Sequence, residues 1–142
     1  MTQGTIDLVT DAISYLQDLI GALTGIEAAP DNPPEGTMAL PCSICYVSDG
    51  TWEISPPGVQ KGLLNLRLEI HFARGVLPEA VAQAMGYNQS IPNEILSNPT
   101  LGGNVNTVTG PISFKFGNLE WGSEDHIGYE FTVPIKMEII LT

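Results

Sequence analysis

The sequence predicts an α+β fold, in which an N-terminal amphipathic helix and short central helices pack on a largely antiparallel β-sheet. Three observations predict it: a helical apolar period over residues 5–24, strict alternation over residues 64–72 and a second alternation over residues 129–141. Strands with one apolar face need a second layer to cover that face, and helices can supply it. The chain has 142 residues, of which 43% are hydrophobic, and this fits one domain over residues 1–142.

The first elements follow from spacing and from proline. Apolar residues recur at spacings of three and four along residues 5–24, and Gly25 is a plausible end of this helix. Three prolines between residues 28 and 36 indicate a stiff, extended linker. Residues 38–47 are then expected to form the first strand.

A turn at Asp49-Gly50 is expected to end that strand. Residues 49–62 are rich in Pro and Gly and form either the extended end of a hairpin or a loop. Residues 64–72 alternate between apolar and polar side chains, which predicts a strand with one buried and one wet face.

Two short helices are expected next. Residues 78–85 begin with Pro78, which suits a first helical turn, and Gly86 is a plausible end. Residues 92–97 form a further helical turn, which Asn98-Pro99 prevents from continuing.

The remaining strands are predicted around glycine and proline. Residues 105–109 and 112–116 are expected to form strands, and residues 117–128 a turn-rich segment. Residues 129–141 close the chain as a long strand. Its Pro134 places that strand at a sheet edge or at a bulge.

The charge balance excludes one class of function. The net charge is −11, from 16 acids and 5 bases, and the first 60 residues contain no Lys or Arg. Tight nucleic-acid binding needs clustered bases, so it is disfavoured. The acidity serves solubility, a basic protein partner or a surface that must not adhere to DNA. No apolar run approaches the roughly 18 residues of a membrane helix, and the first residues do not resemble a signal peptide, so we expect cytoplasmic synthesis and no membrane association.

The two cysteines are expected to be buried free thiols. Cys42 and Cys45 supply two ligands where a structural zinc site needs four. In a strand, positions three apart also face opposite sides. Neither cysteine is therefore assigned to a metal or redox site.

The two histidines leave alternatives open. His71 shares a strand face with Glu69 and Arg67, as a general base oriented by a carboxylate or, more commonly, as part of a solvated charge cluster. His126 follows Glu124-Asp125, which is not expected to hold a metal without a ligand from elsewhere. No nucleophile elbow, phosphate loop or zinc-protease motif occurs. We therefore expect no catalytic residue, no cofactor and no metal.

Trp52 and Trp121 lie in loop-like segments, where a tryptophan either anchors an interface or caps the core. The prolines and glycines around Trp52 favour an interface. The candidate interface residues are Trp52, Ile54, Asp49 and Glu53.

Two ordered blocks point to a family. Residues 91–108 read IPNEILSNPTLGGNVNTV, and the residues that carry the first block are Pro92, Leu96, Asn98, Pro99, Thr100, Leu101, Gly102 and Gly103. The second block consists of Phe116, Gly117, Leu119, Glu120, Trp121 and Gly122, followed by Gly128, Phe131 and Val133 in the last strand. In this order the blocks resemble the tail-terminator (tail-completion) proteins of long-tailed, siphovirus-like bacteriophages, over about residues 76–142 and more weakly in the N-terminal helix. Family members often carry Pro where Asn118 stands and Tyr where Trp121 stands.

The resemblance implies a structural virion protein of the tail neck and not an enzyme. It implies a six-fold ring of this chain that caps the tail tube, ends its polymerisation and provides the head–tail joining surface. The implied partners are further copies of the chain, the major tail-tube protein and the head-closure or connector protein. Genomic DNA would pass through the lumen without sequence-specific binding, and an acidic lumen suits this passage. The ring would close by heterologous association, with the edge-prone final strand joining a neighbour.

Two alternatives stay open. A neighbouring neck protein, such as a head-closure or stopper subunit, would share the size and charge of this chain. A small-molecule-binding module or enzyme would instead place Glu69, His71 or His126 in the wall of a pocket.

Overall fold

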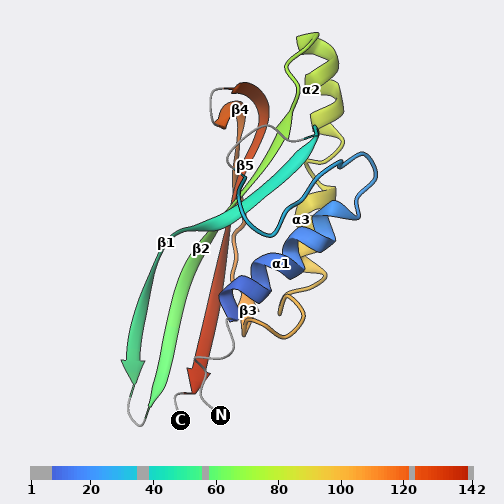
Figure 1. The fold of residues 1–142 in the computed structure, drawn as a ribbon. Helices are drawn as coiled ribbons and strands as arrows, with labels where there is room; N and C mark the ends of the chain where they lie inside the picture. Colours follow the sequence, from blue (N-terminus) through green and yellow to red (C-terminus); the bar gives the residue numbers. More distant parts are fainter. Residues whose placement is uncertain (1–7, 35–38, 56–57, 122–123, 141–142) are drawn as a thin grey trace.

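The computed structural model describes residues 8–34, 39–55, 58–121 and 124–140 and has the predicted α+β fold (Figure 1). The elements of the described residues are α1 (Leu8–Gly21), β1 (Cys42–Ser55), β2 (Val59–Phe72), α2 (Leu77–Met85), α3 (Ser90–Leu96), β3 (Thr107–Val108), β4 (Ser113–Trp121) and β5 (Glu124–Ile140). All pairs between these strands are antiparallel.

Three long strands form the centre of the sheet, in the order β1-β2-β5. β2 pairs with β1 from Cys42↔His71 to Ser55↔Val59, and with β5 from Phe72↔Ile127 to Val59↔Ile140. On its other side β5 pairs first with β4 and further along with β3. The three helices lie on one side of the sheet (Figure 1), which we call the helix-covered face; the other side is the opposite face.

The core lies between the helices and the helix-covered face. Alternate residues of β2 and β5 point into it, because residues two apart in a strand share a face. From β2 and β5 it contains Leu64, Leu66, Leu68, Ile70, Phe72, Ile127, Tyr129, Phe131, Val133, Ile135 and Met137. From the helices it contains Ala12, Leu16, Ile20, Ala80, Ala84, Ile91 and Ile95.

The predicted helices are present, with a shorter first helix. α1 ends at Gly21 and not at Gly25, because the Leu23 N–H bonds to the Ile20 carbonyl and tightens the chain out of the helix. Gly25 instead takes a φ of 95° in the turns that follow. Residues 5–7 lie outside the described residues. α2 and α3 begin one and two residues before the expected starts and end within a residue of the expected ends.

The expected turn at Asp49-Gly50 is wrong, because β1 continues through it. The register shifts between Val47 and Asp49, which places one extra residue, Ser48, in β1. The Ser48 hydroxyl donates to the Asn65 carbonyl (3.2 Å), and the Asn65 amide donates to Asp49 Oδ1 (2.8 Å). A β-bulge thus accommodates the Asp-Gly pair, and residues 49–62 form the extended hairpin end rather than a loop; Pro56 and Pro57 lie outside the described residues.

The expected turn-rich segment over residues 117–128 is also wrong. β4 continues to Trp121 and β5 begins at Glu124, so most of this segment is a β-hairpin. Gly128 is needed for close approach between strands rather than for a turn. Gly128 pairs with Gly117, and a Cβ on Gly128 would overlap the Ile70 carbonyl oxygen. In contrast, β3 is shorter than expected and spans only Thr107–Val108.

The last strand is not an edge strand along most of its length, which corrects the expectation drawn from Pro134. β4 pairs with β5 as far as Thr132, and β3 begins at Ile135. Pro134 occupies the gap between them, where its carbonyl accepts a bond from the Thr109 N–H (2.9 Å). Because the nitrogen and the carbonyl of one residue point to the same side of a strand, the missing N–H of Pro134 faces this gap and not β2.

Candidate interaction surface and buried polar cluster

The far ends of the three long strands extend past α1 and β3 (Figure 1). We call this part the arm: residues 49–55, 59–63 and 136–140. Trp52 lies across from Gly62, and a Cβ on Gly62 would meet the Trp52 ring at 2.5 Å. The glycine therefore makes room for the indole, which remains 42% exposed. Trp52 thus lies in a strand and not in a loop, and it is not buried in the core.

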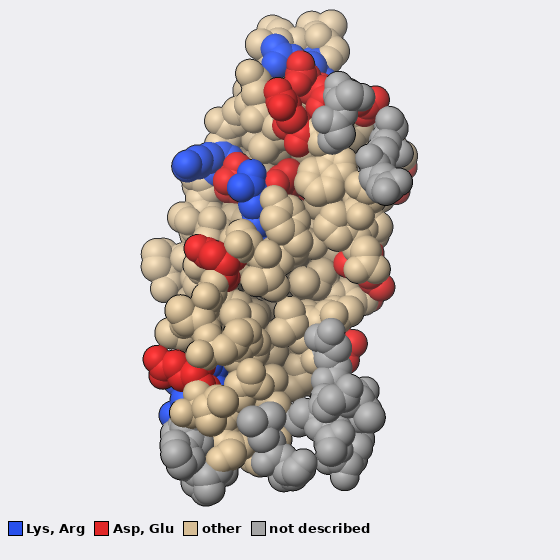
Figure 2. Space-filling view, turned by 60° about the vertical axis from the view of Figure 1, so that its left-hand side comes forward, with Lys and Arg blue, Asp and Glu red and all other residues tan. Residues whose placement is uncertain are grey.

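Both faces of the arm carry exposed apolar side chains. On the helix-covered side Ile54 is 75% exposed, and on the opposite side Leu63 and Ile140 are 58% and 63% exposed. The other two candidate interface residues, Asp49 and Glu53, are exposed as well. The gathering of exposed apolar side chains at one end of the sheet makes the arm a candidate contact surface. In the view of Figure 2 the charged side chains form separate groups with broad uncharged surface between them.

Both outer strands of the sheet have an unpaired edge. Within the described residues, β1 pairs only with β2 apart from an isolated bridge between Ala28 and Cys42, and β4 pairs only with β5. The far end of β5, in contrast, is closed, because the Asn106 side chain accepts a bond from the Glu138 N–H (2.6 Å). The edges that could add a neighbouring strand are therefore β1 and β4, and not the final strand as expected.

A polar cluster is buried on the opposite face, at the end of the sheet away from the arm. Glu69 is 2%, His71 0% and His126 7% exposed. His71 Nε2 lies 2.8 Å from Glu69 Oε1, and His71 Nδ1 lies 2.8 Å from His126 Nδ1. A solvated cluster was the more common interpretation of this pattern, and it is wrong. The β4–β5 hairpin (Figure 1) brings His126 and Trp121 onto this face.

Glu69 is held as a carboxylate by its neighbours. Burial alone would raise the pKa of Glu69, but hydrogen bonds from His71, Tyr46 and Arg67 lower it below its usual value. The Tyr46 hydroxyl donates to Glu69 Oε2 (3.0 Å), and Arg67 Nε donates to the same oxygen (2.7 Å). Arg67 also bonds Glu130 on β5 (2.8 Å). Burial and the charge of Glu69 raise the pKa of Tyr46 to about 12, so this phenol stays a donor.

Trp121 joins this cluster to the segment before β1. Its ring lies 6.3 Å from Tyr46 and 6.4 Å from His71, measured between centroids. Its indole N–H donates to the Pro34 carbonyl (2.6 Å). Trp121 is half-buried and caps the polar cluster, so it is neither in a loop nor a clear interface anchor.

The cysteines are buried free thiols, as predicted. The register places Cys42 beside His71 and Cys45 beside Leu68, which are on opposite faces of the sheet. Burial raises the pKa of Cys42 to about 11 and that of Cys45 to about 12. Both thiols therefore stay protonated and unreactive at neutral pH.

A cavity of about 420 Å³ opens beside His126. Its lining residues are Leu40, Ala73, Arg74, Gly75, Glu124, Asp125 and His126. An imidazole backed by a second imidazole and a carboxylate is an arrangement that can accept a proton. Among the described residues, its lining includes no Ser, Thr, Cys or Lys that could act as a nucleophile. Within the described part of the chain, no group of three or more His, Cys, Asp or Glu side chains is arranged to hold a metal ion.

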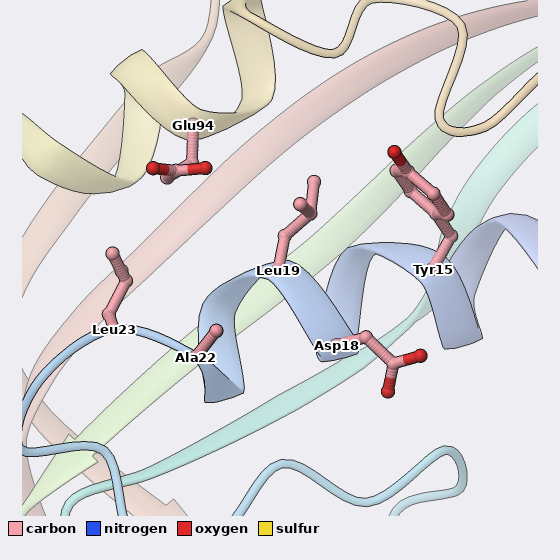
Figure 3. A pocket seen from close by; sticks show the side chains of 6 residues that line it. All are labelled: Tyr15, Asp18, Leu19, Ala22, Leu23 and Glu94. Carbon is pink, nitrogen blue, oxygen red and sulfur yellow. The ribbon is translucent and has the colours of Figure 1, made fainter.

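A second cavity, of about 260 Å³, lies between α1 and α3 (Figure 3). Tyr15, Leu19, Ala22 and Leu23 line it from α1 and the turn that follows, and Glu94 faces it from α3. Asp18 is the remaining lining residue. The described residues of its wall include two acids and no base, so this cavity is unsuited to an anionic ligand.

The residues of the first family block form a tight turn against α1. Leu101 is fully buried with a φ of 47°, and Gly102 and Gly103 have φ values of 73° and 85°. A Cβ on Gly102 would lie 2.7 Å from the Tyr15 ring. The Pro99 carbonyl accepts a bond from the Val108 N–H (2.6 Å), which closes the turn. The Gly102-Gly103 pair therefore lies in a tight backbone turn.

The residues of the second block form β4 rather than a turn. Leu119 is buried beside His126, whereas Glu120 is exposed and pairs with Asp125. Gly117 lies next to Gly128. Gly122 lies outside the described residues.

The contact between His71 and His126, which are 55 residues apart, was not predicted from the sequence. The alternation of the last strand could have been extended back from Tyr129 through Ile127, which would have placed His126 on the polar face of a strand.

Comparison with family models and with curated proteins found no match for this chain. No helix in the described ranges is both long and apolar enough to cross a membrane.

Proposed function

We propose that this chain is a structural subunit of a phage tail neck, which forms a homomeric ring, caps the tail tube and provides the head–tail joining surface. The observation that carries this proposal is the arm, whose exposed Trp52 and Ile54 lie at the free end of an open-edged sheet. The resemblance of the blocks around Gly102-Gly103 and Leu119 to tail-terminator proteins supports it. Neither block contributes a catalytic residue, which is in keeping with a structural role.

The two edges offer a way to close the ring. β1 is 14 residues long and contains no Lys, Arg or Pro, and beyond the bulge at Ser48 no described strand pairs with its outer edge over residues 49–55. β4 lies at the other side of the same sheet and contains Lys115. A contact between the β1 edge of one copy and the β4 edge of the next is heterologous, and it closes into a ring when the rotation per copy divides a full turn. A six-fold ring at the neck is the proposed assembly.

The test separates the arm from the rest of the surface. The double variant Trp52→Ala/Ile54→Ser removes the two exposed apolar groups on one side of the arm. The matched control is Val76→Ser, which changes a similarly exposed apolar residue just before α2 (61% exposed). Each variant replaces the wild-type chain in the phage that encodes it. Particles are imaged, and the mass of the purified protein and of the ring is measured.

We expect the arm variant to stay folded but to give overlong tubes or tails without heads, and the control to assemble normally. Normal capping by the arm variant would contradict the role of the arm. A ring found elsewhere than the head–tail joint would overturn the proposed function. A position between the connector and the terminator would favour the alternative, a head-closure or stopper subunit.

A further inference from the structure

The contact between the two buried imidazoles restricts how many protons they can hold. His71 comes from β2 and His126 from β5, and their rings are nearly perpendicular at 89° with centroids 5.0 Å apart. Their Nδ1 atoms are 2.8 Å apart, which is a hydrogen-bond distance. Such a contact holds one proton, because two N–H groups would point at each other and two lone pairs would repel.

The partners of the outer nitrogens settle the rest of the proton count. Glu69 is ionised and accepts from His71 Nε2, so this nitrogen carries a proton. His71 Nδ1 is then the acceptor when His71 is neutral, and His126 Nδ1 is the donor. His126 Nε2 lies 3.3 Å from Glu124 Oε2, where a proton is favourable as well. The network is therefore satisfied by three protons on two rings, which is one imidazolium and one neutral imidazole.

A fourth ring proton has no place in this arrangement. It would put an N–H group on both Nδ1 atoms, which are only 2.8 Å apart, and no lone pair would be left to accept a hydrogen bond. In the described part of the chain, the other titratable or charged groups around the rings are Cys42 and Tyr46 on β1, Arg67 on β2, Arg74 after β2, and Glu124, Asp125 and Glu130 on β5. None of these groups lies between the two Nδ1 atoms, so none can relieve the contact.

We propose that the His71–His126 contact is an acid-sensitive latch, which holds the β4–β5 hairpin on the opposite face and opens when both imidazoles are charged. Opening separates β5 from β2 at this end, and it loosens Trp121 from the rings of Tyr46 and His71. The arm lies at the other end of the same strands and stays paired. The latch is independent of the proposed ring, because it is a property of the single chain.

The sign of the pH effect follows from the proton count. Histidine becomes protonated between about pH 8 and pH 5, and in the unfolded chain both rings can take a proton freely. The folded chain holds one proton fewer than the unfolded chain at the acidic end of this range. Stability therefore falls as the pH falls. Between pH 6 and pH 5 the unfolding equilibrium constant should rise roughly five- to tenfold, because the unfolded chain binds about one proton more than the folded chain.

The experiment compares the wild-type chain with His126→Gln and Asp125→Asn. The amide of a glutamine can donate to the neutral His71 ring and can turn its oxygen to the charged ring, so this variant accepts the second proton without opening. Asp125→Asn removes a carboxylate beside the same cavity and leaves the ring contact intact. Unfolding by urea is measured at intervals between pH 7.5 and pH 5. We expect the wild type and Asp125→Asn to share the steep acid dependence, and His126→Gln to lose most of it.

A second measurement uses the wild type alone, so the proposal does not depend on a variant that folds. Nitrogen NMR of the histidine side chains reports the protons on each ring. Amide hydrogen exchange, corrected for its intrinsic pH dependence, reports opening of residues 113–132. We expect faster exchange there as the second proton binds, with little change over residues 59–63. Two charged rings with the hairpin still protected, or equal acid dependence in the wild type and His126→Gln, would overturn the latch.

Discussion

The two ends of the opposite face differ although the same three strands build both. At one end Glu69 and His71 are polar and fully buried, and at the other end Leu63 and Ile140 are apolar and exposed. The difference lies in what covers each end. The β4–β5 hairpin lies over the first end, whereas β3 is the last element to pair with β5 before the arm. Polarity along a strand therefore predicts its facing side but not its exposure.

The largest effect should come from the glycine that allows the hairpin to lie over the covered end. In Gly128→Ala the new Cβ would overlap the backbone carbonyl of Ile70, which cannot move without breaking the β2–β5 ladder. We expect a loss of about 3 kcal/mol or more in the free energy of unfolding. Its pairing partner Gly117 is the matched control, because nothing lies within 4 Å of a Cβ there. Equal urea midpoints for the two alanine variants would contradict this account of the covered end.

The next effect concerns the carboxylate of the polar cluster. Glu69→Gln keeps the size of the side chain but removes the charge that faces Arg67 and His71. We expect a loss of about 2–3 kcal/mol in the free energy of unfolding at pH 7. Asp49→Asn is the control at the arm, where the carboxylate is exposed and the change should stay below about 0.5 kcal/mol.

The same pair of variants should also differ in their response to acid. The folded pKa of Glu69 is lower than its usual value, so its contribution is complete above the carboxyl value of 4.5. It is lost as the pH falls through the lower, folded pKa. Glu69→Gln should therefore lack this part of the acid dependence, which lies below the histidine range. If Glu69→Gln lost stability at acidic pH as steeply as the wild type, other carboxylates would be the cause of this acid dependence.

The smallest effect on stability is expected at the arm. Ile54→Ser changes a side chain that is 75% exposed, so the free energy of unfolding should stay within about 0.5 kcal/mol of the wild type. The effect should appear in association with neighbouring subunits rather than in folding. A large loss of thermal stability in the isolated chain would mean that Ile54 packs within its own subunit, which would remove the reason to assign the arm to an interface.

Periodicity in the sequence was sufficient for the main layers. The helical spacing of Ala12, Leu16 and Ile20 and the alternation along residues 64–72 predicted one helix and one strand of the core. The buried thiols of Cys42 and Cys45 were predicted too, since a strand places them on opposite faces. These features depend on local geometry, in which 3.6 residues per helical turn or two per strand repeat fix the direction of each side chain.

Local turn signals were less reliable. Asp49-Gly50, Gly117, Gly128 and Pro134 each suggested an interruption or an edge, and each lies within a strand. A β-bulge accommodates Asp49-Gly50, and close approach of two strands explains Gly128. Pro134 lies in the gap between β4 and β3, the two partners of β5. Whether such a residue ends a strand depends on the strands beside it, and β5 pairs with β2 from a distant part of the chain.

The sequence by itself determined that Glu69 and His71 share a strand face. Only the tertiary structure decided that this pair is buried, and that Trp52 and Ile54 lie in a strand and share a face there. The reason is that alternation acts between neighbours in sequence, whereas burial depends on a covering layer. Here that layer brings His126 onto His71 from 55 residues away. The proton shared by these two rings is therefore a property of the folded chain and of no segment of it.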